Sequence, residues 1–434
     1  MISASSKHYS LSEASKFTLS LALSQSTILL SPLIIKSSGI AEYGRIEIAL
    51  AFASITSIIL SLGLHQLVGV RYVKDRNALK PLVETTLLYL LCLIVAMILL
   101  SLGANRFLTP LLGDISALDR VGIIGFAALI YFKHLTLSIA AMSYRTNLYL
   151  ALELLAAISY ASIVAVCLFA GRVDLTTVIF ANVASVAPNL LAVAVFIWRK
   201  RAEIVGGVQG YVAGGFAKSA GETLRASMPL MAIGLLATAG GAVDRMLLGY
   251  YSISPVEIGT YTLAFRLVSL APLAIQNLIG NIHSREIYHA LSMSGDEQSA
   301  GLRYAIYKNT RLGMLAFAVM MGLFSIGYFV LDLVLPFAYG ISVASFPWYF
   351  VLATAFSLSV ASSFLAPILI YTERTGMLLA SSMLGVMGFA LVNFTMIPTW
   401  GVWASAVAFL VLHLLRLIYL GLTCRKIYRM PRWN

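Results

Sequence analysis

Long apolar stretches dominate the chain, and short polar segments separate them. Each stretch is close to the roughly 20 residues that an α-helix needs to cross a bilayer, and none has the alternation of barrel strands. The stretches run over residues 14–35, 46–70, 82–103, 121–143, 150–170, 175–198, 227–251, 258–281, 310–331, 346–370, 377–397 and 401–422. The pattern predicts an all-α polytopic membrane protein with twelve transmembrane helices.

The composition excludes soluble classes of protein. Charged residues make up 11% of the chain, against roughly 25% in an ordinary soluble protein. The three cysteines form no CxxC motif, so we expect neither a zinc site nor a disulfide framework. No P-loop, HExxH or GxSxG motif occurs. We therefore expect a secondary transporter or flippase, not an enzyme, with no catalytic residues, no cofactor and no metal.

Basic residues are divided unevenly between the two sides of the predicted membrane protein. Of the 30 Lys and Arg residues, 21 lie in the loops and termini of one side, 5 in the loops of the other side and 4 within spans. Because basic residues collect in cytoplasmic loops, we expect both termini in the cytoplasm. The net charge of +12 thus reflects topology, and we expect no nucleic-acid partner.

A glycine-rich segment divides the chain into two sets of six spans. We expect an N-terminal lobe over 1–198, a cytoplasmic linker over 199–226 and a C-terminal lobe over 227–434. A weak repeat at an offset of 215 residues supports the division, with Glu42, Gly44, Ala49 and Ser54 matching Glu257, Gly259, Ala264 and Ser269. Parallel repeats of six spans are typical of transporters that have a substrate path between two pseudo-symmetric halves.

Lys133 is the most central charged residue of any predicted span, with His134 beside it. A charge at bilayer depth usually faces a partner or a wet cavity. Counted from the turn at 145–147, Glu153 lies ~10 Å out of level with Lys133, because a helix rises 1.5 Å per residue. We therefore expect Lys133 to be a cavity cation, or to pair with a helix other than that of Glu153.

Asp244, Arg245 and Arg266 lie at similar depth in the seventh and eighth spans. An Asp244–Arg266 pair across this hairpin is one expectation. Arg245 is rotated ~100° from Asp244, so it would then be the unpaired cation that faces the cavity.

Four further ionisable residues lie within the spans, three of them near span ends. Arg416 either reaches the cytoplasmic interface or lines the cavity, with His413 beside it. His65 is either an interhelical contact or functional, and Glu47 either anchors its helix or takes part in ion coupling. Within the spans cations exceed acids, which favours an anionic substrate group that Lys and Arg can bind.

Five short motifs carry a family resemblance: Gly39–Gly44, Leu60–Leu64, Met228–Leu230, Asp244–Tyr250 and Ile258–Ala264. They resemble the polysaccharide transporter (Wzx-type, O-antigen flippase) branch of the multidrug/oligosaccharidyl-lipid/polysaccharide exporter superfamily. Many relatives carry a proline just after the eighth span, where this chain has Asn281–Arg285.

The resemblance implies two six-helix lobes that form a V around a central cationic cavity and alternate between inward-open and outward-open states. It implies a flippase that moves polyprenyl-diphosphate-linked oligosaccharide from the inner to the outer leaflet of a bacterial inner membrane. Lys133, Arg245 and Arg266 are the expected substrate-binding residues. Membrane lipid, a coupling H+ or Na+, and polysaccharide polymerase and chain-length machinery are the further expected partners, and we expect a monomer.

Three other functions remain open from the sequence. An ion-coupled multidrug or metabolite antiporter of the same superfamily would depend on carboxylates in its cavity. A membrane-embedded polysaccharide polymerase or ligase would need a long external loop, and none is present. A non-transporting scaffold for glycan assembly would tolerate removal of Lys133 or Arg245.

Overall fold

The computed structural model of the chain describes most of the residues on which the predictions fall. The described residues are 19, 23, 26–62, 64, 116–142, 146–171, 173–199, 216–278, 296–339, 347–371 and 374–428. They form the α-helices α2 (Ser26–Ser38), α3 (Ile40–Ser61), α6 (Ala117–Met142), α7 (Thr146–Phe169), α8 (Leu175–Arg199), α10 (Phe216–Tyr250), α11 (Pro255–Leu278), α13 (Asp296–Tyr339), α14 (Tyr349–Ser363), α15 (Ala366–Tyr371), α16 (Thr375–Trp400) and α17 (Val402–Tyr428). Within these ranges the chain is helical, and no strand occurs.

Eight of the described helical segments are long and apolar enough to cross a membrane. The predicted spans overlap described helices, except that the third, 82–103, lies outside the described residues. Two helices extend well beyond their spans. Residues 216–226, expected in the linker, belong to α10, and residues 296–309, expected in a loop, belong to α13. Hydropathy identifies the part of a helix inside the bilayer and misses its polar extension.

The turn between α2 and α3 is also shorter than the sequence predicts. α3 begins at Ile40, six residues before the predicted span. Gly39 adopts a φ of 87°, which a residue without a side chain reaches readily, and a single residue therefore redirects the chain. Glu42 then accepts a hydrogen bond from the backbone N–H of Leu175 at 3.0 Å, which ties the start of α3 to α8.

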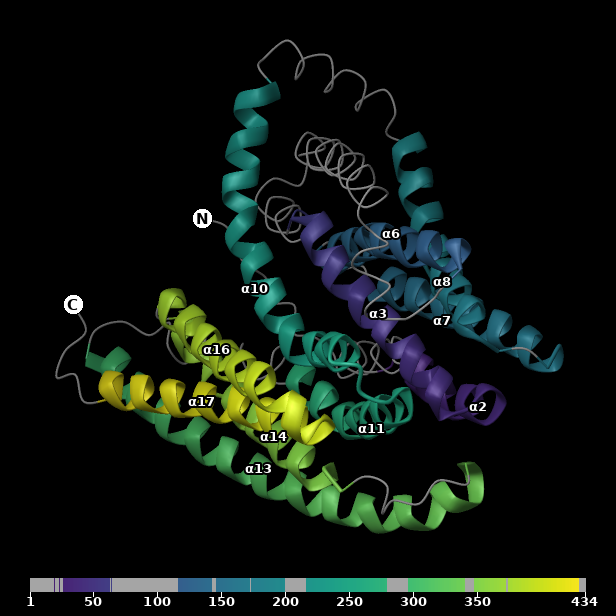
Figure 1. Cartoon of the computed structure of the whole chain (residues 1–434). Coiled ribbons are helices and arrows are strands. Elements are labelled where there is room, and N and C mark those ends of the chain that lie inside the picture. The colour runs from purple at the N-terminus through teal and green to yellow at the C-terminus, as the bar shows by residue number, and fades with distance from the viewer. Residues whose placement is uncertain are drawn as a thin grey trace.

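The helices form two groups that meet at α3, α10 and α11 (Figure 1). α6, α7 and α8 pack with one another, and α3 packs against α6. On the other side α13, α14, α16 and α17 pack together, with α11 against α14 and α10 against α16. α3 contacts both α10 and α11, so it is the main contact between the two groups.

α3 and α11 cross where Gly44 meets Gly259. A side chain on Gly44 would collide with the carbonyl oxygen of Pro255, and one on Gly259 would collide with that of Ile40. Both pairs are related by the offset of 215 residues that defines the sequence repeat, because 44 matches 259 and 40 matches 255. The contact is therefore reciprocal, as a two-fold repeat requires.

Candidate functional site: a cationic central cavity

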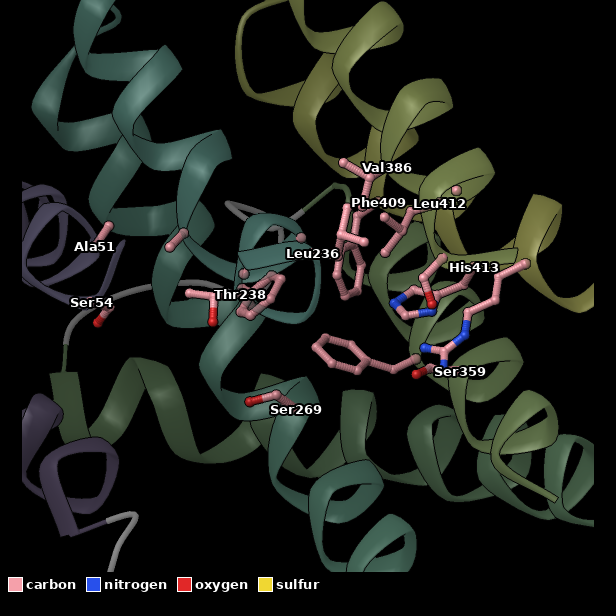
Figure 2. A pocket seen from close by; sticks show the side chains of 18 of the residues that line it. Ala51, Ser54, Leu236, Thr238, Ser269, Ser359, Val386, Phe409, Leu412 and His413 are labelled. Carbon is pink, nitrogen blue, oxygen red and sulfur yellow. The ribbon is translucent and has the colours of Figure 1, made fainter. Parts of the chain in front are cut away.

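A cavity of about 710 Å³ lies between α3, α10, α11, α14, α16 and α17 (Figure 2). The repeat contributes equivalent wall positions from its two copies. Leu50, Ala51 and Ser54 line the cavity from α3, and their counterparts Phe265, Arg266 and Ser269 line it from α11. The cavity is thus built around the same crossing that brings the two groups of helices together.

Three arginines line this cavity, and no carboxylate does among the described residues. They are Arg245 of α10, Arg266 of α11 and Arg416 of α17. The predicted cavity cations Arg245 and Arg266 are therefore in the cavity wall. Arg416 also lines the cavity, which was one of its two predicted positions.

Glu47 of α3 lies behind the wall and pairs with two of the arginines. Arg266 donates a hydrogen bond from Nη2 to Oε2 of Glu47 at 3.1 Å, and Nη1 of Arg245 lies 3.8 Å from the same oxygen. Glu47 is 4% exposed and Arg245 is 3% exposed. One buried carboxylate thus connects three helices, and its charge offsets one of the two guanidinium charges.

The expected Asp244–Arg266 pair is wrong. Asp244 accepts a hydrogen bond from Oη of Tyr261 at 2.6 Å and another from the backbone N–H of Arg245 at 2.8 Å. Similar depth in a hairpin does not fix the direction in which a side chain points. Arg266 faces α3, where Glu47 is available. Arg245 was expected to be unpaired and has Glu47 at ion-pair distance, with its guanidinium 4.7 Å from the centre of the Phe265 ring.

Several buried nitrogen atoms at this cavity have no hydrogen-bond partner within the described part of the protein. They are Nε and Nη2 of Arg245, Nε of Arg266, Nε of Arg416, and both ring nitrogens of His413. His413 is 7% exposed, packs edge-on against the ring of Phe409 at 4.6 Å, and also lines the cavity. Most buried polar groups in proteins are satisfied by protein or by ordered water, so these atoms are available in the cavity to water or to a ligand that accepts hydrogen bonds.

An aromatic cluster forms the apolar part of the wall. Phe265, Phe356 and Phe409 have ring centroids 4.8–5.1 Å apart. Figure 2 shows Phe409 beside Leu412 and His413 on the same wall. The sequence does not distinguish these phenylalanines, because apolar residues are common in every span. The repeat matches Ser54 with Ser269, and that match could have identified both serines as residues that face the cavity.

Lys133 lies outside this cavity, and its predicted lack of a pair with Glu153 is wrong. Nζ of Lys133 is 3.3 Å from Oε2 of Glu153. α6 ends at Met142 and α7 begins at Thr146, so the residues lie nine and seven positions from their helix ends. That difference is ~3 Å, which a lysine side chain bridges easily. Lys133 is thus a structural pair in the described structure and not a cavity cation.

The other two candidate histidines are His134 and His65. His134 is an exposed residue of α6 and does not line it. His65 lies outside the described residues.

Comparison with known proteins reveals similarity in structure only. No family model matches the sequence. No curated protein matches it either. A structure described as the lipid II flippase MurJ in an inward closed conformation has a TM-score of 0.58 and 13% identity, covering 96% of this chain and 89% of its own. An inward-facing multidrug resistance MATE family transporter of the MOP superfamily has a TM-score of 0.55 and 14% identity, covering 95% and 94%.

This likeness establishes the fold. The chain is a multi-pass membrane protein with the all-helical, two-lobed fold of MOP superfamily transporters. A MATE structure in a bent conformation is similar as well, with a TM-score of 0.56 at 11% identity over 95% of this chain and 94% of its own. The predicted fold class is confirmed, whereas the polysaccharide transporter branch stays a prediction.

Proposed function

We propose that this chain is a flippase that moves polyprenyl-diphosphate-linked oligosaccharide from the inner to the outer leaflet of a bacterial plasma membrane. The observation that carries the proposal is the set of unpartnered donors on Arg245, Arg266, Arg416 and His413 in one cavity. A diphosphate offers many acceptor oxygens, and guanidinium groups bind phosphate through paired hydrogen bonds. The fold that this chain shares with the lipid II flippase MurJ supports the same class of cargo.

The charges around the cavity also favour an anion. Arg245, Arg266 and Arg416 supply three positive charges, and Glu47 and Asp244 supply two negative charges nearby. The surplus is one positive charge, without counting His413. No described carboxylate is within ion-pair distance of Arg416, which makes Arg416 the free cation of the site. Desolvating a diphosphate in hydrocarbon is costly, and a cavity of this kind lowers that cost.

Alternating access requires that the contacts on one side of the cavity can separate. The Gly44–Gly259 crossing and the Glu47 pairs hold α3 against α10 and α11. Both are contacts between the two groups of helices. In the proposed cycle the diphosphate binds the arginines, and these contacts open and re-form as the cavity changes sides.

The lipid-linked oligosaccharide pool tests the proposal. In a strain from which the gene is deleted, finished polyprenyl-diphosphate-linked units should accumulate on the inner leaflet, and mass spectrometry would identify the glycan. Arg416→Gln should restore transport poorly, since a charge-assisted hydrogen bond is worth about 1.5–3 kcal/mol, or about 10- to 100-fold in binding. Lys426→Gln is the matched control, because Lys426 is an exposed cation of the same helix. An unchanged pool in the deletion strain contradicts the proposal.

The second candidate is a multidrug antiporter, which the aromatic cluster of Phe265, Phe356 and Phe409 favours. Aromatic faces and the buried carboxylates Glu47 and Asp244 would suit a cationic drug, and MATE transporters share the fold. A deletion strain with a normal lipid-linked pool and increased sensitivity to cationic drugs would support the antiporter. In that case Arg416→Gln should leave drug resistance intact.

A further inference from the structure

A second cavity, of about 770 Å³, lies between α13, α14 and α17. We call it the lateral groove and define it by its wall residues Gly313 of α13, Ala361 of α14, and Leu417, Gly421 and Arg425 of α17. It lies on the other side of α14 and α17 from the central cavity, which the same two helices line with different residues. Its size falls within the roughly 300–1,000 Å³ of small-molecule sites.

The interior of the lateral groove is mostly apolar. Gly313 packs so closely on α14 that a Cβ there would lie 3.1 Å from the carbonyl oxygen of Ala361, so the floor of the groove is formed by backbone and small residues. Gly421 is different, because a Cβ at this position would meet nothing within 4 Å. The missing side chain of Gly421 therefore leaves room in the groove. Met314 and Phe317 complete an apolar wall that suits a flexible hydrocarbon chain.

One end of the groove is basic and aromatic. Arg425 and Tyr428, from the last turn of α17, line this end together with Tyr307 of α13. Arg311 donates a hydrogen bond from Nη1 to Oη of Tyr307 at 3.2 Å. Neither Arg311 nor Arg425 has a carboxylate partner among the described residues, and both are exposed. Tyrosines commonly lie at the level of lipid head groups, so the two arginines are placed where a lipid phosphate would be.

We propose that the lateral groove binds one anionic phospholipid, with an acyl chain along Gly313, Ala361 and Gly421 and the phosphate on Arg425 and Arg311. Surrounding lipid is as apolar as the groove, so the acyl chain gains little binding free energy by entering the groove. The selectivity must come from the head group, and two arginines that have no carboxylate partner among the described residues select negative charge. The C-terminal end of α17 places the site in the leaflet that the basic residues predict to be cytoplasmic. The inference is independent of the cargo of the central cavity.

Native mass spectrometry of the purified full chain tests this proposal with phosphatidylglycerol and phosphatidylcholine as probes. The wild type should retain one phosphatidylglycerol in preference to phosphatidylcholine. Gly421→Leu should abolish this binding because the new side chain occupies the groove, and its Cβ meets no protein atom within 4 Å. Gly322→Leu is the matched control, because Gly322 also lies in a helix with nothing within 4 Å of its Cβ and does not line the groove.

Charge removal gives a second test that does not depend on filling the groove. Arg425→Gln should reduce the preference for phosphatidylglycerol over phosphatidylcholine about fivefold, the factor expected for one basic residue near an anionic lipid. Equal binding of the two lipids to the wild type, or unchanged binding by both Gly421→Leu and Arg425→Gln, would overturn the proposal. Displacement of phosphatidylglycerol by equimolar undecaprenyl phosphate would overturn it as well, because the groove would then be a site for a polyprenyl lipid.

Discussion

Glu47 holds together three helices with a single side chain. Its Oε2 atom is within ion-pair distance of Arg266 and of Arg245, and all three residues are shielded from solvent to a large extent. Removing one partner of a buried ion pair costs more than the pair itself contributes, because the remaining charge stays buried. Removing Glu47 should cost more stability than removing a partner of a single pair, because two guanidinium groups share this carboxylate.

We expect Glu47→Gln to lower the free energy of unfolding by about 3–5 kcal/mol, the cost of leaving a buried charge without its partner. Thermal unfolding of the purified protein in detergent measures the change. Glu257→Gln is the control, because Glu257 is an exposed carboxylate in the first turn of α11. In the double variant Glu47→Gln/Arg266→Gln, part of the lost stability should return. Equal midpoints for Glu47→Gln and Glu257→Gln would contradict this role.

The same residues show what sequence reasoning can provide at this scale. It placed Asp244, Arg245 and Arg266 at one depth and identified the two arginines as candidates for the cavity wall. Their partners were out of reach, because Glu47 comes from a helix that lies about 200 residues earlier in the chain and only the packing of α3 brings it near. The error at Lys133 arose from the position of a turn, which hydropathy fixes only to within a few residues.

At the scale of helices, the crossing of α3 and α11 depends on two glycines. Each faces a backbone carbonyl of the other helix, and backbone cannot move aside as a flexible side chain can. Any larger residue at 44 or 259 must therefore separate the helices. Close helix approach through small residues is a common solution in membranes, where packing rather than the hydrophobic effect joins helices.

Gly44→Ala should destabilise the protein by about 1–3 kcal/mol, the usual cost of overpacking a contact. The comparison is Gly125→Ala in α6, where a Cβ meets nothing within 4 Å; there, alanine should be neutral or stabilising by up to about 1 kcal/mol. Thermal unfolding of both variants gives the difference. Spin labels on α3 and α11 should also lie farther apart in Gly44→Ala than in the parent, and unchanged distances with unchanged stability would show that the crossing is not tight.

The existence of the helices was more predictable than their ends. Apolar runs identified α8 to within one residue and α6, α7 and α16 to within four residues, whereas α17 ends six residues after its predicted span. α10 and α13 begin 11 and 14 residues before their predicted spans. The extra turns carry polar residues such as Lys218 and Arg303. Hydropathy does not distinguish a polar helix outside the bilayer from a loop.

On the scale of the whole molecule, the uneven distribution of basic residues predicts the orientation in the membrane. The turn between α10 and α11 exposes Ser252, and the start of α16 exposes Gly376. These positions belong to opposite sides in the predicted topology, with Ser252 outside and Gly376 in the cytoplasm.

Cysteine labelling in intact cells tests this orientation. After Cys92, Cys167 and Cys424 are replaced by alanine, Ser252→Cys should react with a membrane-impermeant maleimide. Gly376→Cys should react only after the membrane is permeabilised, and labelling of both variants in permeabilised cells is the control for accessibility. The reverse pattern would invert the topology and would place the basic end of the lateral groove in the outer leaflet.

The equivalent positions in the two copies of the repeat share a place in the cavity wall but not its charge. Ala51 of α3 corresponds to Arg266 of α11, and the arginines of the wall all come from α10, α11 and α17. An anionic cargo would therefore remain attached to the C-terminal half through the transport cycle, while the N-terminal half moves past it. In such a cycle the C-terminal half would carry the anion, and the N-terminal half would open and close the path to it.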